Sequence, residues 1–394
     1  MASTMVKGVA LGSAGTSATP SPTTNEQDYC YVGSPPGFSV ANHFADTGTV
    51  WVKFWMDLTA FFPSENSVNS ALFDGLEEQL IAARNNGLAI ILTLWKYPPW
   101  MNGLSGTTTG QFQQGDKTAA MRIPDDVSTT SIWASMITCI LTAYSTGSST
   151  PRRSGAYIDV LEICNEPNGM YWPQSTPAGL RTAGCKVGQM MQTALIISSW
   201  FGNQATAIAG PGAVDYKNEG SPDGMNWNTP GSWADVDHTD AVKFSQDVVA
   251  SFTSVGFVPG TRAVFTMHNH TDIELQRTYV AKVRELALRG SWAGWPYANV
   301  NDPHLWITEG GLTDGARVRL GIGVSAWPVY RALLIQIAWN NLHNNSTSVT
   351  GGGAGIDLFT YYLFETDPAF DCGLIDSVSM GRATRPAYAV WKGL

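Results

Sequence analysis

The chain has 394 residues, which is enough for two or three average domains or for one large barrel with long loops. Charged residues make up 14% of it, the formal net charge is -9, and no run of lysine or arginine is present, which argues against nucleic acid as a partner. The low charge, together with the abundance of glycine (40) and tryptophan (15), does not suit a disordered chain and indicates a large neutral core with an aromatic, polar surface.

Eight strand-like segments alternate with helix-like segments along the chain. The expected strands are residues 6–12, 49–58, 88–97, 157–166, 206–214, 263–270, 304–311 and 356–365. The expected helices have apolar residues at helical spacing and cover residues 71–87, 130–145, 186–202, 240–256, 275–290, 328–345 and 385–394. This alternation is typical of a parallel sheet covered by helices, and eight such units that close on themselves form a (β/α)8 barrel.

The loops hold most of the length beyond a minimal barrel. A (β/α)8 barrel needs about 250 residues, so on the order of a hundred residues lie in connections. Long polar segments follow most of the expected strands, whereas most helix-to-strand returns are short. Active sites of such barrels lie at the carboxyl ends of the strands, where this extra length falls. We therefore predict one catalytic domain over residues 1–394, an α/β protein with a single (β/α)8 TIM barrel and long strand-to-helix loops.

The N-terminal segment MASTMVKGVALGSAG lacks the continuous apolar stretch of a signal peptide. We therefore expect either a cytoplasmic protein or a secreted protein whose leader has been removed. No apolar run is long enough to cross a bilayer, so no membrane partner is expected. The five cysteines are widely spaced and include no CxxC pair, so they show neither a complete disulfide framework nor the spacing of a metal site.

The fourth expected strand ends in LEICNEPNG, residues 161–169. Because side chains alternate along a strand, we expect Glu162, Cys164 and Glu166 to point into the barrel, with Glu166 at its rim. Glu162 lies deeper in this register, where a buried charge needs a partner. Lys53 of the second strand also points inward, so the sequence predicts a contact between Glu162 and Lys53.

The seventh expected strand ends in WITEGG, residues 306–311. The same alternation predicts that Leu305, Ile307 and Glu309 point inward, which places Glu309 at the height of Glu166. Two carboxyl groups that face each other across a pocket are the minimum apparatus for glycoside hydrolysis, because one protonates the leaving oxygen while the other attacks or activates water. The alternative for each glutamate is a helix cap or a salt bridge within a loop.

These two motifs resemble those of a known family. LEICNEPNG is similar to the strand-4 motif of retaining glycoside hydrolases of clan A, and WITEGG is similar to their strand-7 motif. The residues of the strand-4 motif are most similar to those of glycoside hydrolase families 39 and 5, and the resemblance extends along the whole barrel. It implies that Glu166 is the acid/base, that Glu309 is the nucleophile and that Asn165 binds the 2-hydroxyl group of the sugar.

The chain departs from the clan pattern at three strand ends. Clan members commonly carry an arginine near the end of strand 2 and a histidine at the end of strand 3, where this chain has Lys53 and Trp95. Strand 8 commonly delivers a tryptophan beneath the sugar, and here Tyr362 and Glu365 occupy that region. We predict that these four residues bind the substrate, and the departures leave its sugar open.

Strand 6 ends in MHNHTD, with His268 and His270 on one face. Two histidines at this spacing could hold a metal ion, but the sequence shows no third ligand, so we predict neither a metal nor an organic cofactor. The resemblance implies that one of these histidines orients the nucleophile or binds the sugar, and we expect both at the substrate. The loops add aromatic residues such as Trp100 and Trp172, which either pack on sugar rings or fix the loops to the barrel.

The sequence therefore predicts a retaining β-glycoside hydrolase that cleaves O-glycosidic bonds of the β-glucoside or β-xyloside type through a glycosyl-enzyme intermediate. The expected partner is a carbohydrate or glycoside substrate, and the expected state is a monomer or small homo-oligomer. Two alternatives stay open. One is a transglycosylase that uses the same two glutamates, and the other is an inactive barrel that only binds carbohydrate.

Overall fold

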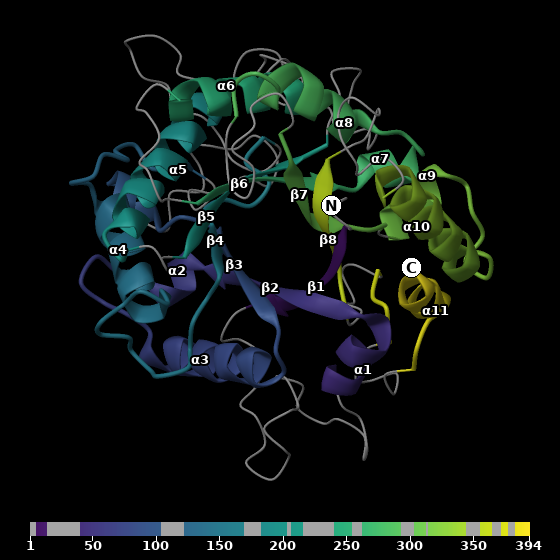
Figure 1. The fold of residues 1–394 in the computed structure, drawn as a ribbon, viewed down its shortest axis with the longest axis horizontal. Helices are drawn as coiled ribbons and strands as arrows, with labels where there is room; N and C mark the ends of the chain where they lie inside the picture. Colours follow the sequence, from purple (N-terminus) through teal and green to yellow (C-terminus); the bar gives the residue numbers. More distant parts are fainter. Residues whose placement is uncertain are drawn as a thin grey trace.

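The computed structural model describes residues 5–13, 40–103, 122–168, 183–202, 206–215, 240–253, 262–292, 303–312, 314–343, 355–364, 372–376 and 383–394. Eight parallel strands form a closed barrel in chain order, with β8 paired to β1 (Figure 1). The strands are β1 (Val6–Ser13), β2 (Thr49–Asp57), β3 (Ala89–Trp95), β4 (Val160–Glu162), β5 (Ala207–Val214), β6 (Ala263–Asn269), β7 (Leu305–Gly310) and β8 (Ile356–Tyr361). The predicted (β/α)8 barrel is confirmed.

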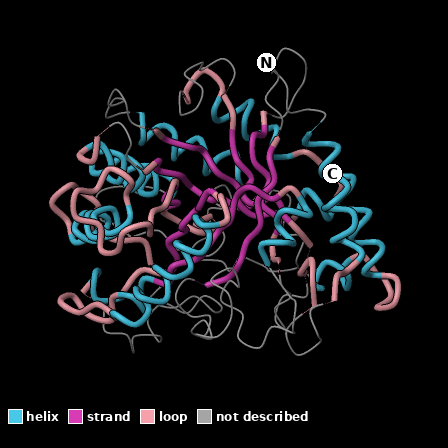
Figure 2. The backbone as a smooth tube through the Cα atoms, turned by 60° about the horizontal axis from the view of Figure 1, so that its bottom comes forward, coloured by secondary structure: helices cyan, strands magenta, loops and turns pink. Residues whose placement is uncertain are grey.

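The helices lie around the outside of the barrel, and the strands gather at its centre (Figure 2). They are α1 (Val40–Thr47), α2 (Leu58–Phe61), α3 (Ser70–Asn85), α4 (Ile132–Tyr144), α5 (Ala183–Ser199), α6 (Ala241–Thr253), α7 (Thr271–Glu274), α8 (Tyr279–Val283), α9 (Asp314–Arg319), α10 (Trp327–His343) and α11 (Pro386–Gly393). A 3-10 turn, η1, covers Pro99–Asn102, and a π-helical turn, η5, covers Arg284–Leu288. Within the described residues, no helix combines the length and apolar character needed to cross a membrane.

Two apolar layers line the strands because successive side chains point to opposite faces. The inner cluster fills the lower part of the barrel and consists of Ile91, Val160, Ala207, Ala209, Val264, Trp306 and Leu358. The larger cluster lies between the strands and the helices and takes the neighbouring positions, for example Leu92 and Leu161. The barrel interior is therefore a packed apolar base, above which polar side chains begin.

Strand β4 is shorter than predicted: it contains three residues, whereas ten, from 157 to 166, were expected. The inward and outward alternation consequently stops after Glu162. Cys164, which we expected inside the barrel, lies in the larger cluster between strands and helices, with its sulfur 3.0 Å from the hydroxyl oxygen of Tyr97. The prediction for Cys164 is wrong because the chain leaves the strand before that residue.

Strand β7 also breaks the predicted alternation. Leu305 and Ile307, which we expected inside, belong to the larger cluster, whereas Trp306 packs in the inner cluster. The pairing between β6 and β7 then shifts by one residue after Ile307, which leaves Thr308 without a partner on β6. This bulge brings Thr308 and Glu309 to the inner side together. Glu309 thus faces the barrel interior. The predicted alternation, which placed Leu305 and Ile307 on the same inward face, is wrong.

Helices α5 and α6 approach each other through two glycines one turn apart on α5. A β-carbon on Gly184 would lie 2.6 Å from the carbonyl oxygen of Phe244, and one on Gly188 would lie 2.3 Å from that of Val248. Both distances are shorter than van der Waals contact, so the helices can pack this closely only where α5 has no side chain.

We expect Gly188→Ala to lower the free energy of unfolding by about 1–3 kcal/mol, because the added methyl group forces α5 and α6 apart. Urea denaturation measures this change. Gly323→Ala is the matched control, since nothing lies within 4 Å of a β-carbon there, and its effect should stay within about 0.5 kcal/mol. An equal midpoint for the two variants would contradict the close approach of these helices.

Candidate functional site

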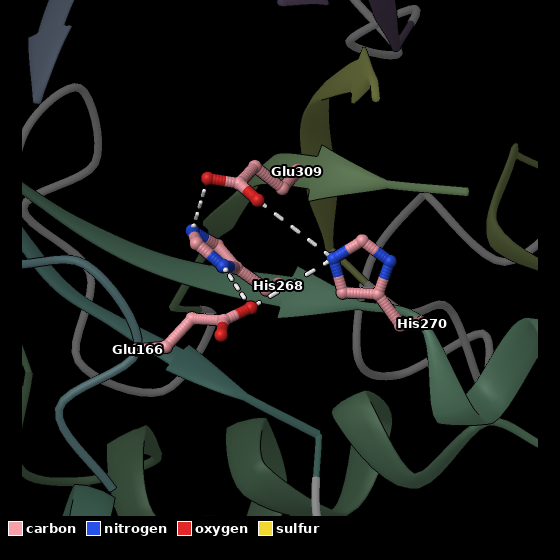
Figure 3. Close-up of side chains that lie close together, drawn as sticks. All are labelled: Glu166, His268, His270 and Glu309. Atoms are coloured by element: carbon pink, nitrogen blue, oxygen red, sulfur yellow. Dashed lines mark hydrogen bonds and ion pairs between the residues drawn. The ribbon is translucent and has the colours of Figure 1, made fainter. Parts of the chain in front are cut away.

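Four titratable side chains meet at the carboxyl ends of β4, β6 and β7 (Figure 3). We call them the quartet, and its members are Glu166, His268, His270 and Glu309. One donor atom from each member lies within 4.8 Å of the donor atoms of the others. Active sites of parallel barrels form at this end, so the quartet lies where the sequence predicts the site.

Glu166 stands on a turn that the neighbouring strand holds in place. Its φ angle of 50° lies in the left-handed region, which residues other than glycine seldom adopt. Its N–H group donates to the carbonyl of Gly212, at 2.9 Å. Two residues on, the buried amide of Asn168 donates to the carbonyl of Val214 and accepts from its N–H group. These bonds to β5 define where the Glu166 carboxyl group projects.

Glu309 is buried and has donors on one oxygen. Its Oε1 accepts hydrogen bonds from Lys53 Nζ at 2.8 Å and from Trp55 Nε1 at 2.9 Å. Burial opposes ionisation, but the neighbouring positive groups, His268 first and then Lys53, hold the pKa of the Glu309 carboxyl group well below its usual range. Glu309 is therefore a carboxylate at neutral pH.

Lys53 is a buried cation shared by two carboxylates. Its Nζ lies 2.9 Å from Glu162 and 2.8 Å from Glu309, which confirms the predicted contact with Glu162 and adds a second one. Burial favours the neutral amine, but the two carboxylates raise the pKa of Lys53 above its ordinary value. Glu162 also accepts from the hydroxyls of Thr93 and Thr308, and its pKa is lowered despite complete burial, chiefly by Lys53.

His268 and His270 connect the two glutamates. Nδ1 of His268 lies 3.0 Å from Oε1 of Glu166, and its Nε2 lies 3.4 Å from Oε1 of Glu309. Nε2 of His270 lies 3.9 Å from Glu166 and 3.8 Å from Glu309, and its Nδ1 lies 3.0 Å from the carbonyl oxygen of Gly311. Burial lowers the pKa of His270, but these acceptors, Glu309 foremost, raise it to about 9.

Asp215 positions the segment that carries His270, and sequence reasoning missed it. Its carboxylate accepts hydrogen bonds from three successive N–H groups, those of His270, Thr271 and Asp272. Such a cap ties the end of β5 to the start of α7. The signal in the sequence was an aspartate directly after a strand, beside the loop that follows strand 6.

Trp55 joins the site to Asn165 and was also missed. Its indole N–H group donates both to Oδ1 of Asn165 and to Oε1 of Glu309, each at 2.9 Å. These bonds fix the amide of Asn165 beside the carboxylate. Alternation would have found Trp55, because it lies two residues after Lys53 on the same face of β2.

Of the other predicted site residues, Tyr362 lies beside the quartet. Its ring meets those of Trp55 and His270 edge to face, with centroids 5.5 and 5.8 Å apart. Trp95 packs against the same small cluster as Tyr362, which includes Trp55. The ammonium of Lys96 lies over the Trp95 ring, 4.0 Å from its centroid. Lys96 therefore covers one face of the Trp95 ring.

Trp100 is bound to the scaffold. Its indole N–H group donates to the carbonyl of Phe62 at 3.0 Å, and its ring packs against the larger cluster. This contact fits the alternative in which such aromatics fix loops to the barrel. Trp172 and Glu365 lie outside the described residues, so their predicted roles stay predictions.

No protein-family model matches the chain, and no curated protein is similar to it in sequence. Solved structures resemble it in fold. A GH5_18 protein from Bifidobacterium longum subsp. infantis superposes with a TM-score of 0.56 at 11% identity, over 99% of this chain and 78% of that one. The β-glycosidase BGL167 gives 0.54 at 12% identity, over 99% and 95%. The likeness to clan A glycoside hydrolases is thus confirmed for the fold.

We expect Lys53→Met to lower the free energy of unfolding by about 3–5 kcal/mol, because it leaves Glu162 and Glu309 buried without their shared counter-charge. Urea denaturation at neutral pH measures the loss. Lys392→Met is the control, since Lys392 pairs with Asp46 at the surface and its removal should cost less than about 1 kcal/mol. Equal losses for the two variants would refute the structural importance of the buried cation.

Proposed function

We propose that the protein is a retaining β-glycoside hydrolase, with Glu309 as nucleophile and Glu166 as acid/base. The observation that carries the proposal is the short separation of these two carboxyl groups, since an oxygen of one lies within 4.8 Å of an oxygen of the other. Retaining enzymes hold their carboxyl groups about 5–5.5 Å apart, whereas inverting enzymes keep roughly 6.5–9.5 Å to admit a water molecule. The separation therefore favours double displacement.

The surroundings of the two glutamates support this division of roles. Glu309 is buried and kept ionised by Lys53, as an attacking carboxylate must be. Its Oε1 is engaged by Lys53 and Trp55, so we assign the attack to Oε2. The Glu166 side chain is 20% exposed, against 5% for Glu309, and this greater access to water suits the group that exchanges protons with solvent.

In the first step, Oε2 of Glu309 bonds to the anomeric carbon while the bond from that carbon to the glycosidic oxygen breaks. The Glu166 carboxyl group gives its proton to the departing oxygen. In the second step, the Glu166 carboxylate takes a proton from a water molecule whose oxygen attacks the anomeric carbon, and Glu309 leaves as a carboxylate. Two side chains supply the nucleophile and the proton, so the scheme needs no metal or organic cofactor.

The proposed substrate is a β-glucoside or β-xyloside, and β-mannosides belong in the test. A GH5_18 protein from Bifidobacterium longum subsp. longum has been crystallised with Manβ1-4GlcNAc, and the Pseudomonas stutzeri endoglucanase Cel5A with cellobiose, at TM-scores of 0.53 and 0.50 to this chain. Trp55 binds Oδ1 of Asn165, and we assign the amide NH2 group of Asn165 to the 2-hydroxyl group of the sugar.

Glu309→Ala should reduce hydrolysis of nitrophenyl β-glycosides on the order of 10⁴-fold or more, because no other group forms the glycosyl-enzyme. Added azide should restore turnover and yield a glycosyl azide of inverted configuration, which NMR identifies. Glu285→Gln, at an exposed surface pair, is the control and should keep full activity. Full activity of Glu309→Ala would refute its role as nucleophile.

Glu166→Gln should lower kcat/KM by about 10²–10⁴-fold for alkyl glycosides, whose leaving groups need a proton. The loss should be much smaller for dinitrophenyl glycosides, whose leaving groups need none. Rates on the two substrate series measure the contrast, and equal losses on both would contradict the acid/base role. Repeating the assay with acceptor sugars separates hydrolysis from transglycosylation.

A further inference from the structure

We propose that the quartet is also a tetrahedral binding site for zinc, and that zinc bound there blocks the reaction (Figure 3). The binding follows from the geometry of the side chains. The inhibition rests on the proposed function, because it requires that Glu166 and Glu309 perform the hydrolysis.

The donor atoms of the quartet lie close enough to surround one ion, since all of them are within 4.8 Å of one another. His268 Nδ1 lies 3.0 Å from Oε1 of Glu166, and His270 Nε2 lies 3.9 Å from that oxygen and 3.8 Å from Oε2 of Glu309. Zinc binds imidazole nitrogen and carboxylate oxygen at about 2.0–2.2 Å, so the ligand atoms around a tetrahedral zinc lie roughly 3.4 Å apart. These three distances bracket that value, and because every separation is within 4.8 Å, a change of at most roughly 1.4 Å in any one of them would close the site around an ion.

Each histidine has a polar neighbour at the ring nitrogen that faces away from the centre of the quartet. Nδ1 of His270 meets the carbonyl oxygen of Gly311 at 3.0 Å, and Nε2 of His268 lies 3.4 Å from both Oε1 of Glu309 and Nζ of Lys53. A histidine that binds a metal usually donates its other N–H group to such an oxygen. In the neutral ring of His270 this contact aims the lone pair of Nε2 at the quartet, and His268 offers Nδ1 to the ion in the tautomer whose proton on Nε2 faces Glu309.

The Glu309 carboxylate is also oriented by hydrogen bonds to one of its oxygens. Lys53 and Trp55 donate to its Oε1, and Oε2 is the oxygen on the side of His270. The carboxylates of the quartet attract cations. The ammonium of Lys53 lies behind Glu309 and repels the ion, so we expect a reversible site and not a permanently occupied one.

Two imidazoles and two carboxylates form a donor set that suits zinc. Magnesium and calcium prefer sets made of oxygen alone, and magnesium demands octahedral geometry. Catalytic zinc sites use three protein ligands and keep the fourth position for water or substrate, whereas closed sites use four. The quartet supplies four, including both proposed catalytic carboxylates, so an ion held there occupies the place of the anomeric carbon and inhibits.

The test is calorimetric titration of the full chain, freed of metal by a chelator, with Zn²⁺ and separately with Mg²⁺. We expect one Zn²⁺ per chain and no binding of Mg²⁺. Co²⁺ serves as a spectroscopic substitute, and its intense visible bands identify tetrahedral coordination. His270→Gln and Glu166→Gln, two partly exposed positions, should each weaken the affinity for Zn²⁺ by at least about 100-fold. His304→Gln is the matched control and should bind as the wild type does, because His304 pairs with Asp357 before β7, at the other end of that strand.

Zinc binding that persists in both folded quartet variants, or absence of binding in the wild type, would overturn the proposal. Circular dichroism establishes that the variants are folded. In the activity assay, Zn²⁺ should compete with the glycoside, and a chelator should restore the full rate. Hydrolysis that continues at saturating Zn²⁺ would disprove the inhibition. A metal-free protein that hydrolyses no glycoside would instead count against the proposed function and leave the binding result standing.

Discussion

The site depends on one buried cation, the ammonium group of Lys53. A lone charge in a protein interior is so costly that it persists only with a partner, and Lys53 has two, Glu162 and Glu309. Glu162 in turn depends on the hydroxyls of Thr93 and Thr308. Removal of Lys53 leaves two buried carboxylates without their shared counter-charge, so both depend on this one side chain.

The apolar base of the barrel strengthens this network. Trp306, Val160 and the other residues of the inner cluster fill the space beneath the charges and exclude water from below. In such surroundings each charge-assisted hydrogen bond is stronger than it would be in water, and each missing one is more damaging. The rigid polar layer then presents Glu309 upward as an ionised group, while Glu166 stands on a turn with partial access to solvent.

The barrel and the contact between Lys53 and Glu162 could be predicted because they depend on regular strands, in which apolar periodicity and side-chain alternation are sufficient. The errors arose where the backbone stops being regular. Cys164 was misplaced because β4 ends early, and Leu305 because β7 contains a bulge, and both features depend on pairing with neighbouring strands. The sequence predicted all four members of the quartet at the substrate, but not that their donor atoms would lie within 4.8 Å of one another. Its histidines are close in sequence, but its glutamates come from other strands.

The bulge in β7 means that a single backbone irregularity decides the chemical character of the barrel. With regular pairing, Glu309 would take the outward positions of Leu305 and Ile307 and face the helices. The extra residue lets Thr308 donate to the buried Glu162 while the next residue, Glu309, joins Lys53 and the quartet. Loss of the Thr308 codon would restore regular alternation with the glutamate still facing inward, but it would remove the hydroxyl group that donates to Glu162, so the extra residue is what lets one strand serve both carboxylates.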